Sequence, residues 1–242
     1  MTVEISTESF ELRTADGDMR CYEARPLDGA RGAVVVIQEA FGVNDHIEDV
    51  TRRFAREGFH AVAPDLFHRG GGGTAEYGDW GRVIELFTGL SDETSLADVD
   101  AALDHLRGEG WNDDQLGIVG FCFGGRVTFL VAAHRDIGAA VGFYGGGIAS
   151  QGALPFPPLI DRAPSLATPW LGLFGDDDES IPVESVEALR VALADTPLDG
   201  EVVRYPGVGH GFHCDARPDH FDPEAAHDAW RRTLAWFDRH LA

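Results

Sequence analysis

Lysine is absent from this chain of 242 residues, and all 19 of its basic residues are arginine. Chemistry that needs a lysine amine, such as Schiff-base formation or lysine general-base catalysis, is therefore excluded. The 41 acidic residues leave a formal net charge of -22, which repels nucleic acid and anionic membrane surfaces at long range. We expect neither as a partner. Salt adaptation and codon bias are alternative explanations of such a composition, and the composition alone does not separate them.

Cysteine and long apolar runs are also scarce. The three cysteines, Cys21, Cys122 and Cys214, have neither paired nor zinc-type spacing, which argues against a disulfide framework or a structural zinc site. No apolar run approaches the roughly 18 residues of a membrane span. The acidic start of the chain, MTVEISTESFE, lacks the basic and apolar regions of a signal peptide. We expect a cytoplasmic monomer or small homo-oligomer with free thiols.

Apolar runs typical of strands alternate with segments of helical periodicity along the chain. This pattern predicts a mostly parallel sheet covered by helices on both faces, in a single α/β domain over residues 1–242. The turn signal Asp16-Gly17 predicts an antiparallel hairpin at the start. The expected strands are 3–12, 19–24, 32–37, 59–67, 115–121, 138–145, 169–175 and 201–207, and the expected helices are 44–58, 95–110, 123–134, 183–195 and 225–241.

Two segments rich in glycine or proline, 68–81 and 145–169, interrupt this alternation. The strand and helix pattern resumes after each of them, so neither is interpreted as a linker between domains. In an open α/β sheet such excursions gather at the carboxyl ends of the strands and line the ligand crevice. They are expected to border the functional site.

Cys122 stands in the sequence GIVGFCFGGR, between Gly120 and Gly124 and directly after an apolar run. A strand that turns straight into a helix here forms a G-x-nucleophile-x-G elbow. Such a turn strains the backbone of the nucleophile and needs glycines where strand and helix come close. The helix N-terminus also favours thiolate over thiol. A small buried structural cysteine is the alternative interpretation, so the partners of Cys122 decide.

An elbow nucleophile needs an acid and then a histidine at the ends of later strands. His210 follows the last expected strand in the sequence VGHGFH, and the sequence GDDDESIP follows the strand before it. Among the three aspartates we select Asp178, three residues after Gly175 and four before Pro182. Asp176 and Asp177 are interpreted as parts of a solvated acidic loop.

The chain resembles the dienelactone hydrolase family of α/β-hydrolases over nearly its whole length. Five ordered segments carry the resemblance: QEAFG (38–42), APDLF (63–67), GFCFGG (120–125), GDDDESIP (175–182) and GHGF (209–212). The resemblance implies the α/β-hydrolase fold and a catalytic triad of Cys122, His210 and Asp178. It also implies hydrolysis of a small-molecule ester or lactone through an acyl-enzyme. No cofactor is expected, because a triad and an oxyanion hole suffice for this reaction.

The resemblance further implies that Glu39 helps to activate the nucleophile, and that the backbone N–H groups of Ala40 and Phe123 form an oxyanion hole. The position of Glu39 in the sequence also favours a functional role, because a carboxylate directly after a buried strand is costly unless it has a function or a partner. A structural salt bridge is the alternative interpretation of Glu39.

The residues that bind a substrate carboxylate are not all present. Family members that act on dienelactone hold its carboxylate with a serine directly after the catalytic histidine and with arginines, one of them four residues past that histidine. The resemblance places Gly211 and Cys214 at these positions. Arg82 is the substrate-binding arginine that we select, with Arg126 and Arg162 as alternatives. A less charged ester or lactone is the expected substrate.

A metal site is rejected, and two other interpretations of the chain are left open. The histidines of HGFHC match no common zinc pattern, so no metal site is expected. A non-catalytic module could keep the same pocket and use Cys122 as an oxidisable thiol or bind a ligand. A thioester or amide could replace the ester as the bond that is hydrolysed. Cys21 and Cys214 are interpreted as bystanders.

Overall fold

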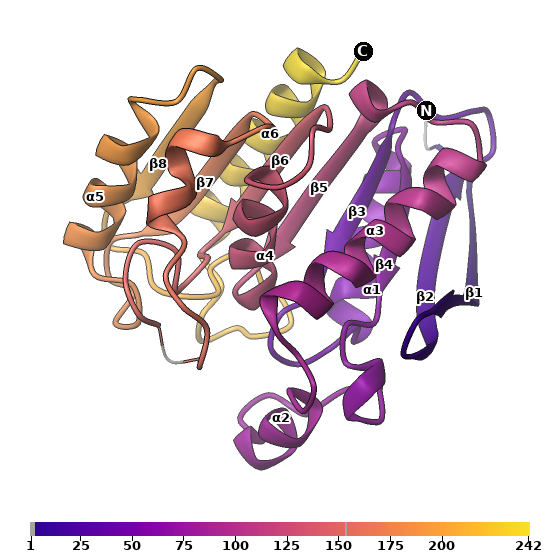
Figure 1. Ribbon diagram of the computed structural model, residues 1–242, viewed down its shortest axis with the longest axis horizontal. Helices are drawn as coiled ribbons and strands as arrows, with labels where there is room; N and C mark the ends of the chain where they lie inside the picture. The colour runs from indigo at the N-terminus through magenta and orange to yellow at the C-terminus, as the bar shows by residue number, and fades with distance from the viewer. Residues whose placement is uncertain (1–2, 153) are drawn as a thin grey trace. The chain divides into compact units, whose positions relative to one another are not determined.

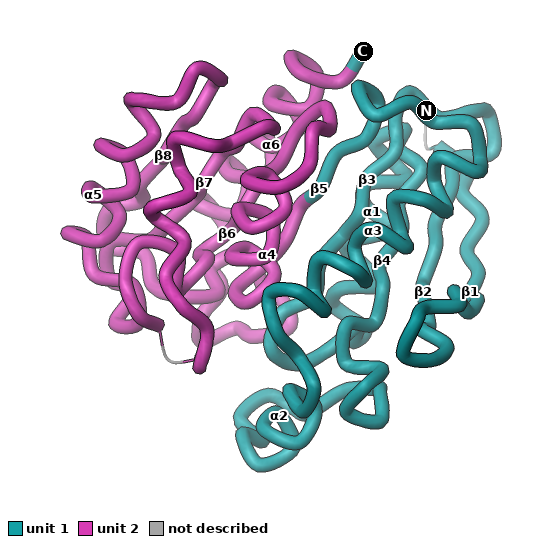
Figure 2. Tube along the Cα trace, in the orientation of Figure 1, with its two compact units in different colours: residues 1–118, 242 teal, residues 119–241 magenta. Residues whose placement is uncertain are grey.

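The computed structural model describes residues 3–152 and 154–242, and the chain divides into two compact units (Figure 2). The first unit contains the chain up to Ile118 together with Ala242, and the second contains residues 119–241. Residues 1 and 2 of the predicted domain, and residue 153 of the predicted excursion 145–169, lie outside the described residues. A single domain over residues 1–242 stays a prediction.

The sheet of the first unit has the strand order β1-β2-β4-β3. β1 and β2 form the antiparallel hairpin that Asp16-Gly17 predicts, β2 pairs antiparallel with β4, and β3 pairs parallel with β4. All residues of β3 and β4 are buried, as expected for strands that are covered on both faces. The strands are β1 (Ile5–Thr14), β2 (Gly17–Pro26), β3 (Ala33–Ile37) and β4 (His60–Pro64).

Two long helices cover the sheet of the first unit, α1 (Asp45–Arg56) on one face and α3 (Asp92–Gly108) on the other (Figure 1). α1 begins where the sequence predicts, because the Asn44 side chain accepts a hydrogen bond from the Ile47 N–H group and so caps the helix. It ends at Arg56, two residues before Gly58. The φ of Gly58 is +90°, in the left-handed region that glycine adopts readily after a helix.

A short helix that the sequence pattern did not predict begins at the end of the first predicted excursion, 68–81. This helix, α2 (Trp80–Leu86), has 7 residues, too few for its periodicity to stand out beside the preceding glycines. Val83 and Leu86 pack in a buried cluster with Phe41, Phe67 and neighbouring apolar residues. The excursion is thereby anchored against the chain that follows β3.

In the second unit the strands follow one another in chain order, beginning with the second half of β5 (residues 119–121) and continuing through β6, β7 and β8. Residues 116–118 of β5 belong to the first unit. β6 pairs parallel with β7, and β7 pairs parallel with β8. Helices α4 and α6 cover opposite faces of β6 and β7 (Figure 1). The elements are β5 (Leu116–Phe121), α4 (Phe123–Ala132), β6 (Ala139–Phe143), β7 (Trp170–Gly175), α5 (Val183–Leu193), β8 (Gly200–Tyr205) and α6 (Pro223–His240).

The predicted α/β fold class, with an antiparallel hairpin before a mostly parallel sheet and helices on both faces, is confirmed. Short 3₁₀ helices add detail to the connections at His68–Gly70, Asp113–Gln115 and Ile160–Ser165. Among the described residues, we find no helix with the length and apolar character that crossing a membrane requires.

Candidate active site

Cys122 lies at the sharp turn between β5 and α4 in the second unit. Its backbone has a φ of +55° and a ψ of -114°, a conformation that is strained for a residue with a side chain. Its N–H group donates to the Phe143 carbonyl over 3.0 Å. A Cβ atom on Gly120 would lie only 2.2 Å from the Gly124 carbonyl oxygen. Gly120, two residues before the cysteine, is therefore required by the close approach of strand and helix.

Asp178 and His210 lie in the loops that follow β7 and β8. Because these two strands are parallel neighbours, their carboxyl ends bring the two loops to the same edge of the sheet. His210 Nδ1 lies 2.6 Å from Asp178 Oδ2. An ionised carboxylate only accepts hydrogen bonds, so this contact places a proton on Nδ1 and leaves Nε2 for other chemistry.

The charges around His210 favour its imidazolium form. Burial acts to lower the pKa of His210, but the charge interaction with Cys122 and hydrogen bonds with Asp178 and Cys122 outweigh burial and raise the pKa to about 10. For Asp178, burial acts to raise the pKa, and the hydrogen bonds and charge of His210, with hydrogen bonds from Ser180, lower it overall. The structure thus brings Cys122, His210 and Asp178 into one interacting group.

The three neighbouring aspartates have three different environments. Asp178 is buried and Asp177 is exposed. The interpretation of Asp176 as part of a solvated loop is wrong, because Arg204 donates to both of its carboxylate oxygens, over 2.7 and 2.8 Å. Arg204 comes from β8, which sequence periodicity does not connect to this loop. Asp176 therefore ties the loop after β7 to β8.

Two further residues contact this group and were missed by the sequence analysis. Tyr144 is fully buried, its ring centroid lies 5.0 Å from that of His210, and its φ is +38°. Ser180 donates to Asp178 from its side chain over 2.6 Å. The available signals were the glycine run that begins directly after Tyr144 and the position of Ser180 two residues after an aspartate, where Asx turns close.

Phe123 is the first residue of α4, as the predicted oxyanion-hole role requires. Glu39 and Ala40 belong to the first unit, where they follow β3 and are buried. Their roles toward Cys122 stay predictions.

The three arginines that the sequence offers as carboxylate-binding residues have different environments. Arg82, in α2 of the first unit, donates to Glu85 over 3.0 Å and to the Gly72 carbonyl over 3.1 Å. Arg126 is buried and donates to the Pro157 carbonyl, whereas Arg162 is exposed. Arg217, which the sequence analysis did not consider, approaches the histidine loop, since a Cβ atom on Gly211 would lie 3.4 Å from its Nη1.

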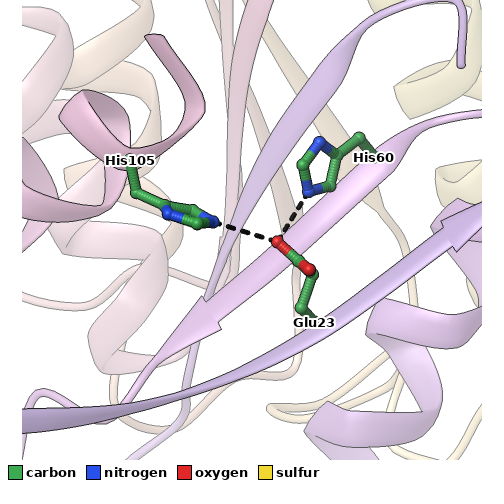
Figure 3. A group of neighbouring side chains, drawn as sticks. All are labelled: Glu23, His60 and His105. Atoms are coloured by element: carbon green, nitrogen blue, oxygen red, sulfur yellow. Dashed lines mark hydrogen bonds and ion pairs between the residues drawn. The ribbon is translucent and has the colours of Figure 1, made fainter. Parts of the chain in front are cut away.

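A second polar group, Glu23, His60 and His105, lies in the first unit (Figure 3). The imidazole Nε2 atoms of His60 and His105 are 2.7 and 3.1 Å from Glu23 Oε1, and such donor atoms could in principle hold a metal ion. However, Trp111 Nε1 donates to His60 Nδ1 over 3.1 Å. A neutral His60 then carries its proton on Nε2, where a metal would have to bind. The Arg25 guanidinium, 2.6 Å from Glu23 Oε2, adds a positive charge that disfavours a cation.

We therefore interpret this group as a buried hydrogen-bonded cluster that stabilises the first unit. Burial acts to raise the pKa of Glu23, but hydrogen bonds from His60, Arg25 and His105 lower it well below its usual range. A carboxyl whose pKa is lowered in the folded state contributes stability above its unfolded pKa of about 4.3 and loses it as the pH falls further.

Glu23→Gln is expected to lower the free energy of unfolding at pH 7 by about 3 kcal/mol, because the buried hydrogen-bond donors lose their charged partner. The difference from the wild type should shrink as the pH falls below about 4. Urea unfolding at a series of pH values measures both effects. Glu109→Gln, which removes the exposed partner of Arg25, should cost at most about 1 kcal/mol. Equal losses for the two variants would contradict the cluster's role.

Comparison with known proteins shows similarity over most of the chain. Residues 19–241 match the model of the Dienelactone hydrolase family. A relative in Salmonella typhimurium with the provisional name carboxymethylenebutenolidase is 41% identical over 240 residues, which cover 96% of this chain and 87% of the relative. The carboxymethylenebutenolidase of Rhodococcus opacus is 32% identical over 219 residues, which cover 88% of this chain and 83% of that protein.

A solved structure supports the same relationship. The crystal structure of a protein from Klebsiella pneumoniae, provisionally described as a dienelactone hydrolase, superimposes with a TM-score of 0.89 at 37% sequence identity. The match covers 98% of this chain and 100% of that one.

Proposed function

Because this chain belongs to the dienelactone hydrolase family and has the α/β-hydrolase fold, we propose that it hydrolyses small carboxylic esters or lactones with Cys122 as its nucleophile. The observation that supports the proposal is that Cys122 contacts His210, which in turn contacts Asp178. Cys122, strained at a helix N-terminus, interacts with the imidazole of His210. His210 in turn lies 2.6 Å from Asp178. Together these residues offer a nucleophile, a proton carrier and a group that orients the carrier.

The resting site in this proposal is an ion pair. His210, whose pKa is raised by Cys122 and Asp178, is proposed to be the imidazolium that stabilises a thiolate on Cys122. Cys122 is the N-cap residue of α4, so the positive end of the helix dipole lies beside the same sulfur. A thiolate attacks a carbonyl carbon far more readily than a thiol does.

Acylation follows from this geometry. The Cys122 sulfur forms a bond to the acyl carbon, and the carbonyl π electrons move to the oxygen as an oxyanion. The Phe123 N–H group at the start of α4 is proposed to stabilise this charge, and the resemblance adds Ala40 as a second donor and Glu39 as an activating group. When the oxyanion collapses, the carbon–oxygen ester bond breaks, and the leaving alkoxide takes a proton from the His210 imidazolium.

Deacylation uses the neutral imidazole that remains. His210 Nε2 accepts a proton from water as the water oxygen attacks the thioester carbon. Collapse of this second intermediate breaks the carbon–sulfur bond, releases the acid and restores the thiolate and imidazolium. Asp178 keeps its hydrogen bond to Nδ1 in both steps, which holds the ring and stabilises its charged form.

Trapping the acyl-enzyme tests the proposal. Rapid acid quench during turnover of p-nitrophenyl acetate, followed by digestion and peptide mass mapping, should place the acetyl group on Cys122. Cys122 is partly exposed whereas Cys21 and Cys214 are buried, and burial raises the pKa of the Cys21 thiol to about 12. Acetylation of Cys214, or turnover without any acylated cysteine, would refute the assignment. Absence of turnover together with reversible oxidation of Cys122 would favour a redox-sensing module.

We also expect a neutral aryl ester or lactone to be hydrolysed with kcat/KM comparable to or above that of dienelactone. Gly211 and Cys214 supply neither the hydroxyl nor the guanidinium that the resemblance places at these positions, and Cys214 is fully buried. Loss of a bidentate clamp and a hydroxyl weakens binding of the transition state of an anionic substrate. Parallel kinetics on the two substrates at moderate salt measure the ratio.

A preference for dienelactone of more than about 100-fold, equivalent to roughly 2.7 kcal/mol, would contradict this expectation. Arg217→Met would then identify the cation, since Arg217 lies nearest to Gly211 among the contacts found for that glycine.

A further inference from the structure

One residue supplies both hydrogen bonds that the structure shows at Oδ1 of Asp178, the oxygen that faces away from His210. Ser180 Oγ donates to this atom over 2.6 Å, and the Ser180 N–H group donates to it over 2.9 Å. The other oxygen, Oδ2, lies 2.6 Å from His210 Nδ1. The two carboxylate oxygens are thus assigned to two different partners, and this assignment defines the rotation of the carboxylate.

The two hydrogen bonds from Ser180 depend differently on the side chain at this position. The N–H bond closes an Asx turn, which any residue other than proline would also close. The Oγ bond requires a hydroxyl, so serine or threonine must stand there. The single hydroxyl proton points to the ionised carboxylate, which cannot donate. An oxygen lone pair is then left for the His210 Nδ1–H group, 3.5 Å away.

Core packing does not account for a serine here. Ser180 is exposed, so its side chain fills no interior space, and its polar contacts are with Asp178 and His210. Nearby Ser185 provides a contrast, since its hydroxyl pairs instead with Ser150 over 3.0 Å.

We propose that Ser180 is a positioning residue, whose hydroxyl fixes the carboxylate of Asp178 so that Oδ2 meets His210 Nδ1–H throughout the reaction. This inference rests on the proposed function, in which His210 carries the proton. Without the hydroxyl, the carboxylate keeps only the turn N–H at Oδ1 and rotates more freely. The imidazole is then less well oriented toward the leaving group and toward water.

Kinetics of Ser180→Ala, Ser180→Thr and the control Ser185→Ala on a neutral aryl ester test the positioning role. Ser180→Ala should lower kcat about tenfold with KM within about twofold, because orientation for proton transfer is lost while substrate contacts are kept. Ser180→Thr should recover most of kcat, and Ser185→Ala should resemble the wild type. Equal losses in the alanine and threonine variants, or no loss in either, would overturn the proposal.

A carbon-13 NMR titration of the Asp178 carboxyl, assigned by its absence in Asp178→Asn, provides a readout that does not depend on hydrolysis. Removal of a donor to the ionised form raises a carboxyl pKa. The pKa of Asp178 should therefore rise by about one unit in Ser180→Ala and little in Ser180→Thr. An unchanged pKa in Ser180→Ala would overturn the role of the hydroxyl.

The two readouts separate failure of this inference from failure of the proposed function. If the wild type hydrolyses no ester but the NMR shift occurs, the hydroxyl still positions Asp178 and the assigned reaction is wrong. If the wild type turns over through Cys122 but both readouts are unchanged, the reaction stands and the role of Ser180 is wrong.

Discussion

Replacement of Cys122 by alanine is expected to reduce kcat/KM for a small aryl ester by at least about 10⁴-fold. The variant has no nucleophile at the elbow, so the reaction can no longer proceed through a thioester. What remains is binding and whatever oxyanion stabilisation the N-terminus of α4 provides. Steady-state kinetics with active-site titration measure the loss. The strained turn itself should persist, because its N–H bond to the Phe143 carbonyl comes from the backbone.

Cys214→Ala is the matched control for this loss. Cys214 lies in the second unit as well and follows His210 by only four residues, but it is buried and our proposed mechanism does not use it. The kcat/KM of Cys214→Ala should stay within about threefold of the wild type when the two are compared at equal concentrations of folded protein. Retained activity in Cys122→Ala, or an equal loss in both variants, would remove Cys122 from the mechanism.

Asp178→Asn is expected to have the second largest effect, a decrease in kcat/KM of about 10²- to 10⁴-fold. An asparagine can present an N–H group to His210 Nδ1, which favours the tautomer with its proton on Nε2, where the water proton must be accepted. The negative charge and the hydrogen bond of Asp178, which act together with Cys122 to raise the pKa of His210, are also lost.

The sign of the accompanying pH effect follows from this charge. Loss of an anionic neighbour disfavours the imidazolium, so the pKa of His210 should fall in Asp178→Asn. The His210 imidazolium should then lose its proton at a lower pH than in the wild type. The alkaline limit of activity should therefore move to lower pH. The pH dependence of kcat/KM measures this shift.

Asp177→Asn is the control, because Asp177 precedes Asp178 directly but is exposed. It should retain kcat/KM within about tenfold, or 1.4 kcal/mol. Asp176 is a poorer control, since its two hydrogen bonds with Arg204 hold the loop. A larger loss at Asp177 than at Asp178 would show that the wrong aspartate had been selected.

Local sequence patterns were sufficient to predict most of the fold and the turn at Cys122. Buried strands, helix caps and tight turns depend on residues within a few positions of one another, as the Asn44 cap and the hairpin at Asp16-Gly17 illustrate. The close approach of Gly120 to Gly124 is equally local. The elbow at Cys122 added the order of acid and histidine, because that order follows from the order of the strands, and the family resemblance agreed with it.

Only the tertiary structure decided which side chains meet across long separations in the chain. Arg204 reaches Asp176 because β7 and β8 are neighbours, which turned a predicted solvated aspartate into a structural one. Glu23 meets residues 37 and 82 positions away, and no periodicity encodes such distances. Hydrogen bonds and ion pairs depend on positions within a few tenths of an ångström, and those positions are set by packing of the whole unit. The sequence alone therefore determined the elements and the candidate nucleophile, while the fold decided the environment of each charge.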